Sequence, residues 1–154
     1  MSTKFSKFLI MVFVTIVLAI GCEDKKAEDN KPESGRIMGT ITFLGDWPAV
    51  GQVAVSLNVN WFPTGAPYAF SSITQNDLVN GTYDYDFTDV VFGDYALIVV
   101  SWKNPADDNN TTNQIPIGGH SGTNPNYFDA DLISITANDS ELTIDFIADF
   151  SLIN

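Results

Sequence analysis

The chain has 154 residues, with 19 acidic and 7 basic side chains and a formal net charge of −12 at pH 7. This charge argues against binding to nucleic acid and against attraction to anionic lipid, and it leaves cations or neutral molecules as partners. One cysteine and one histidine exclude an internal disulfide and a zinc site built from several histidines or cysteines.

Residues 1–21 have the pattern of an export signal. Lys4 and Lys7 precede an apolar run from Phe8 to Ile20 that only Thr15 interrupts. A basic start followed by a short apolar segment is typical of a secretory signal. The run is also shorter than the roughly 20 residues that a helix needs to cross a bilayer. We therefore expect a signal helix that is removed after export.

The only cysteine follows this run directly, in the segment Leu18-Ala19-Ile20-Gly21-Cys22. The segment resembles the processing site of bacterial lipoproteins, with Ala19 where that family prefers Leu, Val or Ile. The resemblance implies cleavage before Cys22, lipidation of its thiol and acylation of the new amino group with fatty acids such as palmitate. Several acyl chains would anchor the protein stably to a membrane. The alternative is an ordinary secretory signal followed by a cysteine that stands there by chance.

Residues 22–35 then form the lipidated cysteine and a tether. Residues 23–35 contain no large apolar side chain, so we expect them to be disordered and to span on the order of 20 Å. Loss of Lys4 and Lys7 leaves 5 basic and 19 acidic residues, a charge of −14. Glu23 and Asp24 resemble the surface-export signals of Bacteroidetes lipoproteins. The lipoprotein resemblance thus implies a cell-envelope location, on the outer membrane of a Gram-negative bacterium, facing the periplasm or the cell surface.

Residues 36–154 are expected to form one β domain. They show no stretch of ten or more residues with a helical period. Short β-branched and aromatic runs alternate with Gly, Pro, Asn and Asp instead. This pattern predicts an all-β fold, and we expect a two-sheet antiparallel sandwich, immunoglobulin-like or prealbumin-like. About seven strands are expected, at 36–44, 52–60, 68–74, 82–90, 95–102, 127–137 and 141–150.

Alternation of apolar and polar residues predicts which side chains face the core. The expected inward-facing residues of the first two strands are Ile37, Gly39, Ile41, Phe43, Val53, Val55, Leu57 and Val59. Those of the fourth strand are Tyr83, Tyr85 and Phe87. The continuous apolar run 96–100 predicts a central strand that is covered on both faces.

The end of the chain is expected to consist of one long loop and one hairpin. Residues 104–126 are rich in Asn, Asp, Gly, Thr and Pro. This predicts an irregular stretch that is functional or mobile. The strands 127–137 and 141–150 are expected to pair as a hairpin across Asn138-Asp139-Ser140.

Three segments carry a second resemblance: Gly39-Thr40-Ile41-Thr42-Phe43, the run from Val90 to Val99, and Leu142-Thr143-Ile144-Asp145-Phe146. They resemble the prealbumin-like or carboxypeptidase-regulatory-like β-sandwich modules of bacterial surface lipoproteins. The resemblance implies a fold more than a function. The hydroxyisourate hydrolases of this fold need several histidines and a C-terminal Tyr-Arg-Gly-Ser, where this chain ends Ser151-Leu152-Ile153-Asn154.

Aromatic residues in the loops suggest a carbohydrate-binding platform. Trp47, Trp61, Phe62 and Tyr68 lie in or beside Pro/Gly turns, where their rings could stack on sugars. The alternative is that these rings cover the open ends of the sandwich.

Acidic and amide residues in the 104–126 loop suggest a calcium site. Asp107, Asp108 and Asn110 are the candidate ligands, together with Asp129 or Asp131 across the loop. Calcium prefers oxygen ligands in flexible loops. The alternative is a solvated polar loop, because the spacing does not match a calcium-binding loop of known pattern.

Gly119-His120-Ser121-Gly122 suggests a hydrolase nucleophile elbow, but Thr123 stands where that motif needs glycine. The alternative is a glycine-rich turn. We therefore expect no enzyme activity, and a lipoprotein that displays a binding or structural module. Its expected partners are the membrane, through Cys22, and a glycan or another envelope protein. Carbohydrate binding is the second hypothesis, and a hydrolase is a distant third.

Overall fold

The computed structural model describes residues 31–110, 112–121 and 130–153. The chain divides at residue 30, and the described residues all lie in the second unit, Lys31–Asn154. The expected signal helix, Cys22 and the tether up to residue 30 therefore lie outside the described residues. Within the described residues, no helix is long and apolar enough to cross a membrane.

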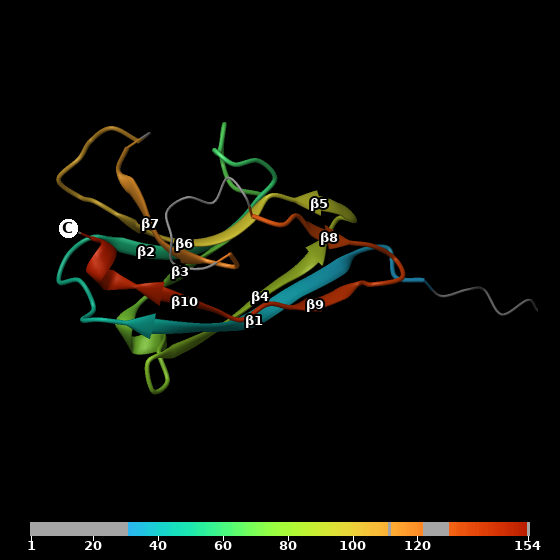
Figure 1. The fold of residues 1–154 in the computed structure, drawn as a ribbon, viewed down its shortest axis with the longest axis horizontal. Helices are drawn as coiled ribbons and strands as arrows, with labels where there is room; N and C mark the ends of the chain where they lie inside the picture. Colours follow the sequence, from blue (N-terminus) through green and yellow to red (C-terminus); the bar gives the residue numbers. More distant parts are fainter. Residues whose placement is uncertain (1–30, 111, 122–129, 154) are drawn as a thin grey trace, which may run out of the picture. The chain divides into compact units, whose positions relative to one another are not determined.

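The described part of the second unit is built almost entirely from strands (Figure 1), which confirms the all-β class. Two short 3-10 helices are also present, η2 (Gln75–Asp77) and η4 (Phe150–Leu152). The strands are β1 (Gly35–Leu44), β2 (Gln52–Asn58), β3 (Ala69–Ile73), β4 (Thr82–Val90), β5 (Gly93–Tyr95), β6 (Leu97–Lys103), β7 (Gln114–Gly119), β8 (Ile133–Ile135), β9 (Glu141–Thr143) and β10 (Phe146–Asp149).

The larger sheet has the strand order β3-β2-β6-β7-β10-β1-β4, and β9 also pairs with β1. Both β9 and β10 run parallel to β1, whereas the other neighbours are antiparallel. The sheet is therefore mixed, and the expectation of purely antiparallel sheets is wrong. A second, two-stranded sheet is formed by β5 and β8.

The larger sheet curls so that its two edge strands, β3 and β4, approach each other. The hydroxyls of Ser71 on β3 and Tyr83 on β4 are hydrogen-bonded at 2.9 Å. This contact draws together the two ends of the strand order, so the curled sheet surrounds its own core. The β3 strand at 69–73 also confirms the short edge strand expected near 68–74.

The predicted alternation is confirmed along β1 and β4, and along β2 up to its last residue. Ile37, Ile41, Val55, Leu57 and Tyr85 are all almost fully buried in one cluster. The β2 strand ends at Asn58, however, and Val59 is 51% exposed. The expected inward position of Val59 is wrong, because the chain leaves the sheet after Asn58.

The expected strand 95–102 is two strands in two sheets. β5 ends at Tyr95 and pairs with β8, and β6 begins at Leu97 between β2 and β7. Ile98 and Val100 of β6 lie in the main core, and Leu97 and Val99 lie in a second apolar cluster. β6 is thus covered on both faces, as its continuous apolar sequence predicts.

The 104–126 stretch is not irregular throughout, because it contains β7 in the middle of the larger sheet. Pro116 lacks an N–H group, and such a residue disfavours an interior strand. The β6–β7 register passes from Val100↔Gly118 to Ser101↔Pro116, which leaves Ile117 as an extra residue. Such a bulge is where a proline can stand in an interior strand.

The expected hairpin between 127–137 and 141–150 is also wrong. The turn itself is present, since Thr136 and Asp139 form an isolated bridge. The chain then separates: β8 pairs with β5, whereas β9 and β10 pair with β1. Residues 127–129 of the expected hairpin lie outside the described residues.

Candidate functional site

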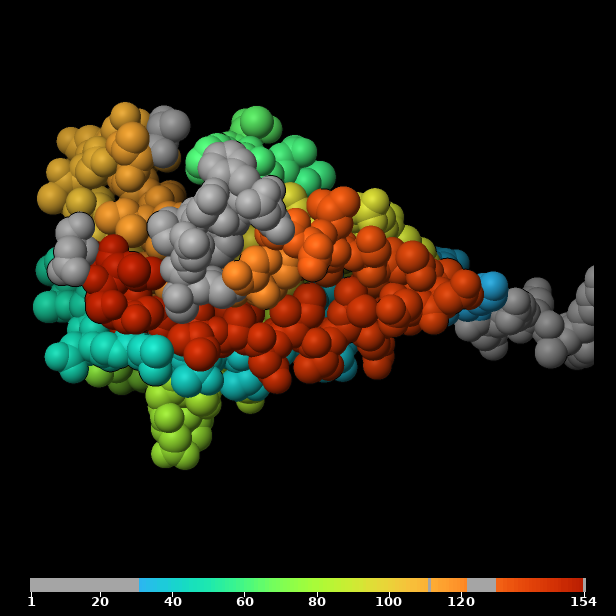
Figure 2. Space-filling view, in the orientation of Figure 1, coloured from blue at the N-terminus to red at the C-terminus, as the bar shows by residue number. Residues whose placement is uncertain are grey.

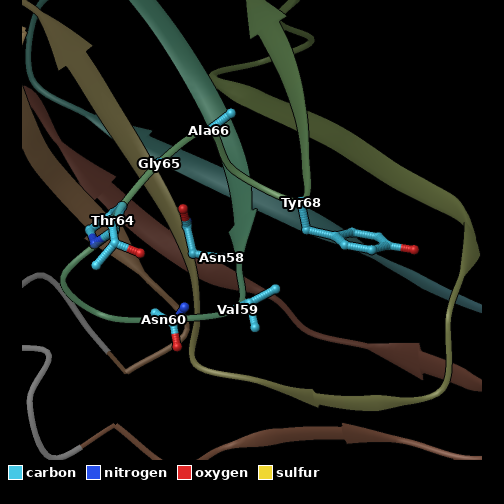
Figure 3. A pocket seen from close by; sticks show the side chains of 8 residues that line it. Asn58, Val59, Asn60, Thr64, Gly65, Ala66 and Tyr68 are labelled. Atoms are coloured by element: carbon cyan, nitrogen blue, oxygen red, sulfur yellow. The ribbon is translucent and has the colours of Figure 1, made fainter.

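The connection between β2 and β3 forms a pocket of about 340 Å³. Figure 2 shows this connection in green at the top of the view, on the surface of the molecule. Figure 3 shows the side chains around the pocket. The lining residues are Asn58, Val59, Asn60, Pro63, Thr64, Gly65, Ala66 and Tyr68.

Asn58 forms the inner end of this pocket and is 4% exposed. Its Nδ2 donates to the Ser56 hydroxyl at 3.0 Å and to the Ser56 carbonyl at 3.4 Å. Its backbone carbonyl accepts from Ala96 N at 2.8 Å. The side-chain oxygen of Asn58 is directed toward the part of the loop that carries Thr64 and Gly65 (Figure 3). Asn58 is therefore held in place with an acceptor facing the pocket.

Tyr68 stands at the rim and is 40% exposed. Its hydroxyl accepts from Val91 N at 3.0 Å, and its ring meets that of Tyr95 edge-on at 5.0 Å. The Tyr95 hydroxyl in turn donates to the Val91 carbonyl at 2.8 Å. Burial, and then hydrogen bonding to Tyr68, raises the pKa of Tyr95. These contacts fix the Tyr68 ring at the edge of the pocket.

Trp61 and Phe62 belong to the same connection but face different surroundings. Trp61 packs against the second apolar cluster, which includes Leu97 and Val99. Phe62 is 60% exposed, and its ring centroid lies 5.0 Å from that of Trp61. The connection thus has one aromatic ring anchored on the domain and one exposed to solvent.

Trp47 lies elsewhere, in the connection between β1 and β2. Its ring centroid is 5.6 Å from that of Phe43 and 5.0 Å from that of Phe150, both edge-on. It therefore packs against the main core, whereas Trp61 packs against the second cluster. The structure thus places Trp61 and Tyr68 in one connection and Trp47 in another.

The 104–113 segment joins β6 to β7 and is held by its own hydrogen bonds. The Asp107 carboxylate accepts from Asn109 N at 2.9 Å and from the Thr112 hydroxyl at 2.7 Å. These two donors, the Thr112 hydroxyl foremost, lower the pKa of Asp107. Asn104 N donates to the Asn113 carbonyl at 2.8 Å and closes the loop. The first calcium candidate is thus occupied by groups of the loop itself.

Asn113 is the buried residue of this loop, with 2% exposure. Its Nδ2 donates to the Asp107 carbonyl at 3.2 Å and to Asn110 Oδ1 at 3.5 Å. Its Oδ1 is buried and has no hydrogen-bond partner among the described residues. Such an oxygen is a place where a water or an ion can be held.

Of the other calcium candidates, Asp108 and Asn110 lie in the same loop. Asp108, Asn110 and Asp131 are exposed, and Asp129 lies outside the described residues. Across residues 31–110, 112–121 and 130–153, no three His, Cys, Asp or Glu side chains are grouped as a metal site. A cation here would therefore need amide or backbone oxygens in addition to carboxylates.

His120 connects β6 to the segment before β8. Its Nε2–H donates to the Asp131 carbonyl at 2.8 Å, and its Nδ1 accepts from Ile98 N at 3.4 Å. Its backbone N–H also donates to the Ile98 carbonyl at 3.1 Å. Both ring nitrogens are therefore engaged with backbone groups. Ser121 is exposed and adjacent in sequence.

Comparisons with protein-family models, with curated proteins and with solved structures found no match to this chain. Sequence reasoning singled out Trp61 and Tyr68 but missed Asn58, Asn60 and Thr64. Asn58 and Asn60 flank a β-branched residue directly before a loop with two prolines and a glycine. This pattern is the sequence signal from which these polar residues could have been found.

Proposed function

We propose that the chain is a cell-envelope lipoprotein, anchored through lipid on Cys22, that displays a non-catalytic β module. The single observation that supports this most strongly is the position of the only cysteine, directly after an apolar run that ends in Gly21. The acyl chains expected there would hold the chain to a membrane without a spanning helix. In this proposal the protein is held on the outer membrane, and its domain faces the periplasm or the cell surface.

The proposal includes a sandwich architecture for the displayed domain. Tyr95 of β5 and Ile133 and Ile135 of β8 belong to the same buried cluster as Ile37 of β1. The small sheet therefore shares one core with the larger sheet, as two stacked layers do. The prealbumin-like resemblance supports the same arrangement.

The position at which β1 begins supports a display role. β1 begins beside the β8–β9 turn, where Arg36 N donates to the Ser140 carbonyl at 2.7 Å. β1 then runs for 10 residues, or about 33 Å, toward the β1–β2 and β6–β7 connections (Figure 1). A tether that joins at residue 35 would leave these connections at the other end of the domain.

A hydrolase is not proposed, because both ring nitrogens of His120, the candidate base, are bonded to backbone groups. A binding role is favoured over a purely structural role by the pocket between β2 and β3.

Membrane fractionation of cells that express the wild-type chain or Cys22→Ala tests the anchor. We expect the wild-type protein in the membrane fraction, resistant to high salt and alkaline carbonate and released only by detergent. Cys22→Ala lacks the acylated thiol, so we expect it to leave the membrane fraction. Equal membrane retention of the two proteins would refute the proposal.

A further inference from the structure

We infer that the pocket of residues 58–68 binds a neutral saccharide. This goes beyond anchoring and display, and it does not depend on the lipid. It also differs from a platform of loop aromatics, because Trp47 packs against the main core and takes no part. The inference rests on the charge, the hydrogen-bonding groups and the shape of the pocket lining.

The lining residues carry amide, hydroxyl and apolar groups, and neither a carboxylate nor an amine is among them. The whole chain nevertheless has 19 acidic residues and a net charge of −12. The field of such a chain repels an anionic ligand. A cationic ligand would need a carboxylate in the lining to replace its lost hydration. The pocket is therefore matched to a ligand without charge.

The polar groups of the pocket suit a ligand rich in hydroxyls. The amides of Asn58 and Asn60 offer both donors and acceptors, and the Thr64 hydroxyl can act as either. Ser56 already occupies Nδ2 of Asn58, which leaves the side-chain oxygen as the acceptor that faces the pocket. A sugar hydroxyl can donate to that oxygen and accept from a second group at the same time.

The inner end of the pocket is already in place before a ligand arrives. Asn58 is 4% exposed and is tied to β2 and to Ala96 by hydrogen bonds. Ordering such a group costs little on binding, because its freedom is lost on folding. Asn60 and Thr64 line the same pocket, so its lining contains three polar side chains.

Apolar groups complete the match. Val59, Pro63 and Ala66 alternate with the polar lining residues, and Tyr68 stands at the rim. The exposed ring of Phe62 lies in the same connection. Sugar rings present C–H surfaces between their hydroxyls, and such surfaces pack against apolar and aromatic side chains. A volume of about 340 Å³ lies at the lower end of the range for small-molecule sites.

Isothermal titration calorimetry of the purified full-length protein, in a detergent without a sugar headgroup, tests the inference. The probes are maltotriose, cellotriose, xylotriose and triacetylchitotriose, with trigalacturonate as the charged comparison. We expect at least one neutral trisaccharide to bind with a Kd of about 1 mM or below and trigalacturonate to bind at least about tenfold more weakly. Absence of binding by all four neutral probes, or equal binding of trigalacturonate, would overturn the inference.

Two variants locate the site. Asn60→Ala and Thr64→Val each remove one hydrogen-bonding group from an exposed side chain. Each should weaken binding by about three- to tenfold and leave the melting temperature unchanged. Asn138→Ala, on the exposed turn between β8 and β9, is the matched control and should bind as the wild type does. Binding that survives both pocket variants would place the saccharide elsewhere and refute this site.

Discussion

Tyr85 links β4 to β10 and to the segment between β9 and β10. It stands on β4 with 2% exposure, and its hydroxyl donates to the Ile144 carbonyl, between β9 and β10, at 2.7 Å. Its ring lies 5.5 Å from that of Phe87 and 5.9 Å from that of Phe146. Burial, and then the charge of Asp145, raises the pKa of Tyr85.

Tyr85→Phe should change both the stability at neutral pH and its alkaline dependence. At pH 7 the variant loses a buried hydrogen bond, so its free energy of unfolding should fall by about 1–2 kcal/mol. Above pH 10 an unfolded tyrosine loses its proton while Tyr85 keeps it. The wild type should therefore lose up to about 1.4 kcal/mol per pH unit through this group. Urea titrations at pH 7 and between about pH 10.5 and 11.5 measure both effects.

The variant has no hydroxyl at this position to ionise, so its stability should decline less steeply with pH. Part of the decline remains, because the pKa of Tyr95 is raised as well. Tyr83→Phe on the same strand is the control for hydroxyl loss. Tyr83 is half-buried, whereas Tyr85 is 2% exposed, so the loss at pH 7 should be below about 1 kcal/mol. If the free energy of unfolding fell equally steeply with pH for the wild type and for Tyr85→Phe, this result would contradict a raised pKa of Tyr85.

At the scale of elements, β7 depends on a glycine. A Cβ built on Gly118 would lie 2.1 Å from the Ile147 carbonyl oxygen and 2.6 Å from the Ala148 Cα. The pairing of β7 with β10 is the single Ala148↔Gly118 pair. The two backbones can therefore approach this closely only because residue 118 has no side chain.

Gly118→Ala should destabilise the fold by about 1–3 kcal/mol, because the contact is with backbone that cannot move aside. Gly65→Ala is the matched control, since its Cβ would meet nothing within 4 Å. Its effect should stay below about 0.5 kcal/mol. Urea unfolding measures both variants, and equal stability of the two would contradict the close approach of β7 and β10.

The elements that the sequence predicts well are those with a strong local pattern. Alternation along β1 and β4, and the apolar run of β6, were sufficient to place their core residues. The strand β7 was missed because Pro116, Gly118 and Gly119 are loop signals when read locally. Only its neighbours explain them: a bulge beside Pro116 and the close backbone of β10 at Gly118. Asn138-Asp139 likewise predicts a turn but not which strands its two sides join.

The connection between β6 and β7 is stable without an ion in our account. The Asp107 carboxylate is bonded to Asn109 and Thr112, and Asn104 and Asn113 close the loop. Thermal melts in chelator and in about 1 mM calcium should therefore have the same midpoint. An ion bound at 100 times its Kd would add about 2.7 kcal/mol, or several degrees. A rise of that size would contradict this account.

At the scale of the molecule, composition and periodicity predict the fold class but not the sheet. Strand order depends on pairings far apart in sequence, such as β1 with β10, and local patterns carry no record of them. The candidate site likewise depends on structure that local sequence patterns do not record. Aromatic residues in loops were visible in the sequence, whereas the role of Asn58 appears only once β2 ends and the loop 59–68 closes over it.

The most direct test of the central claim is the mass of the N-terminal tryptic peptide of the protein purified from membranes. Cleavage after Lys25 would release Cys22-Glu23-Asp24-Lys25. We predict that this peptide begins at Cys22 and carries a diacylglyceryl group on sulfur and an acyl group on nitrogen. A chain that retains residues 1–21, or that carries an unmodified Cys22, would contradict the account.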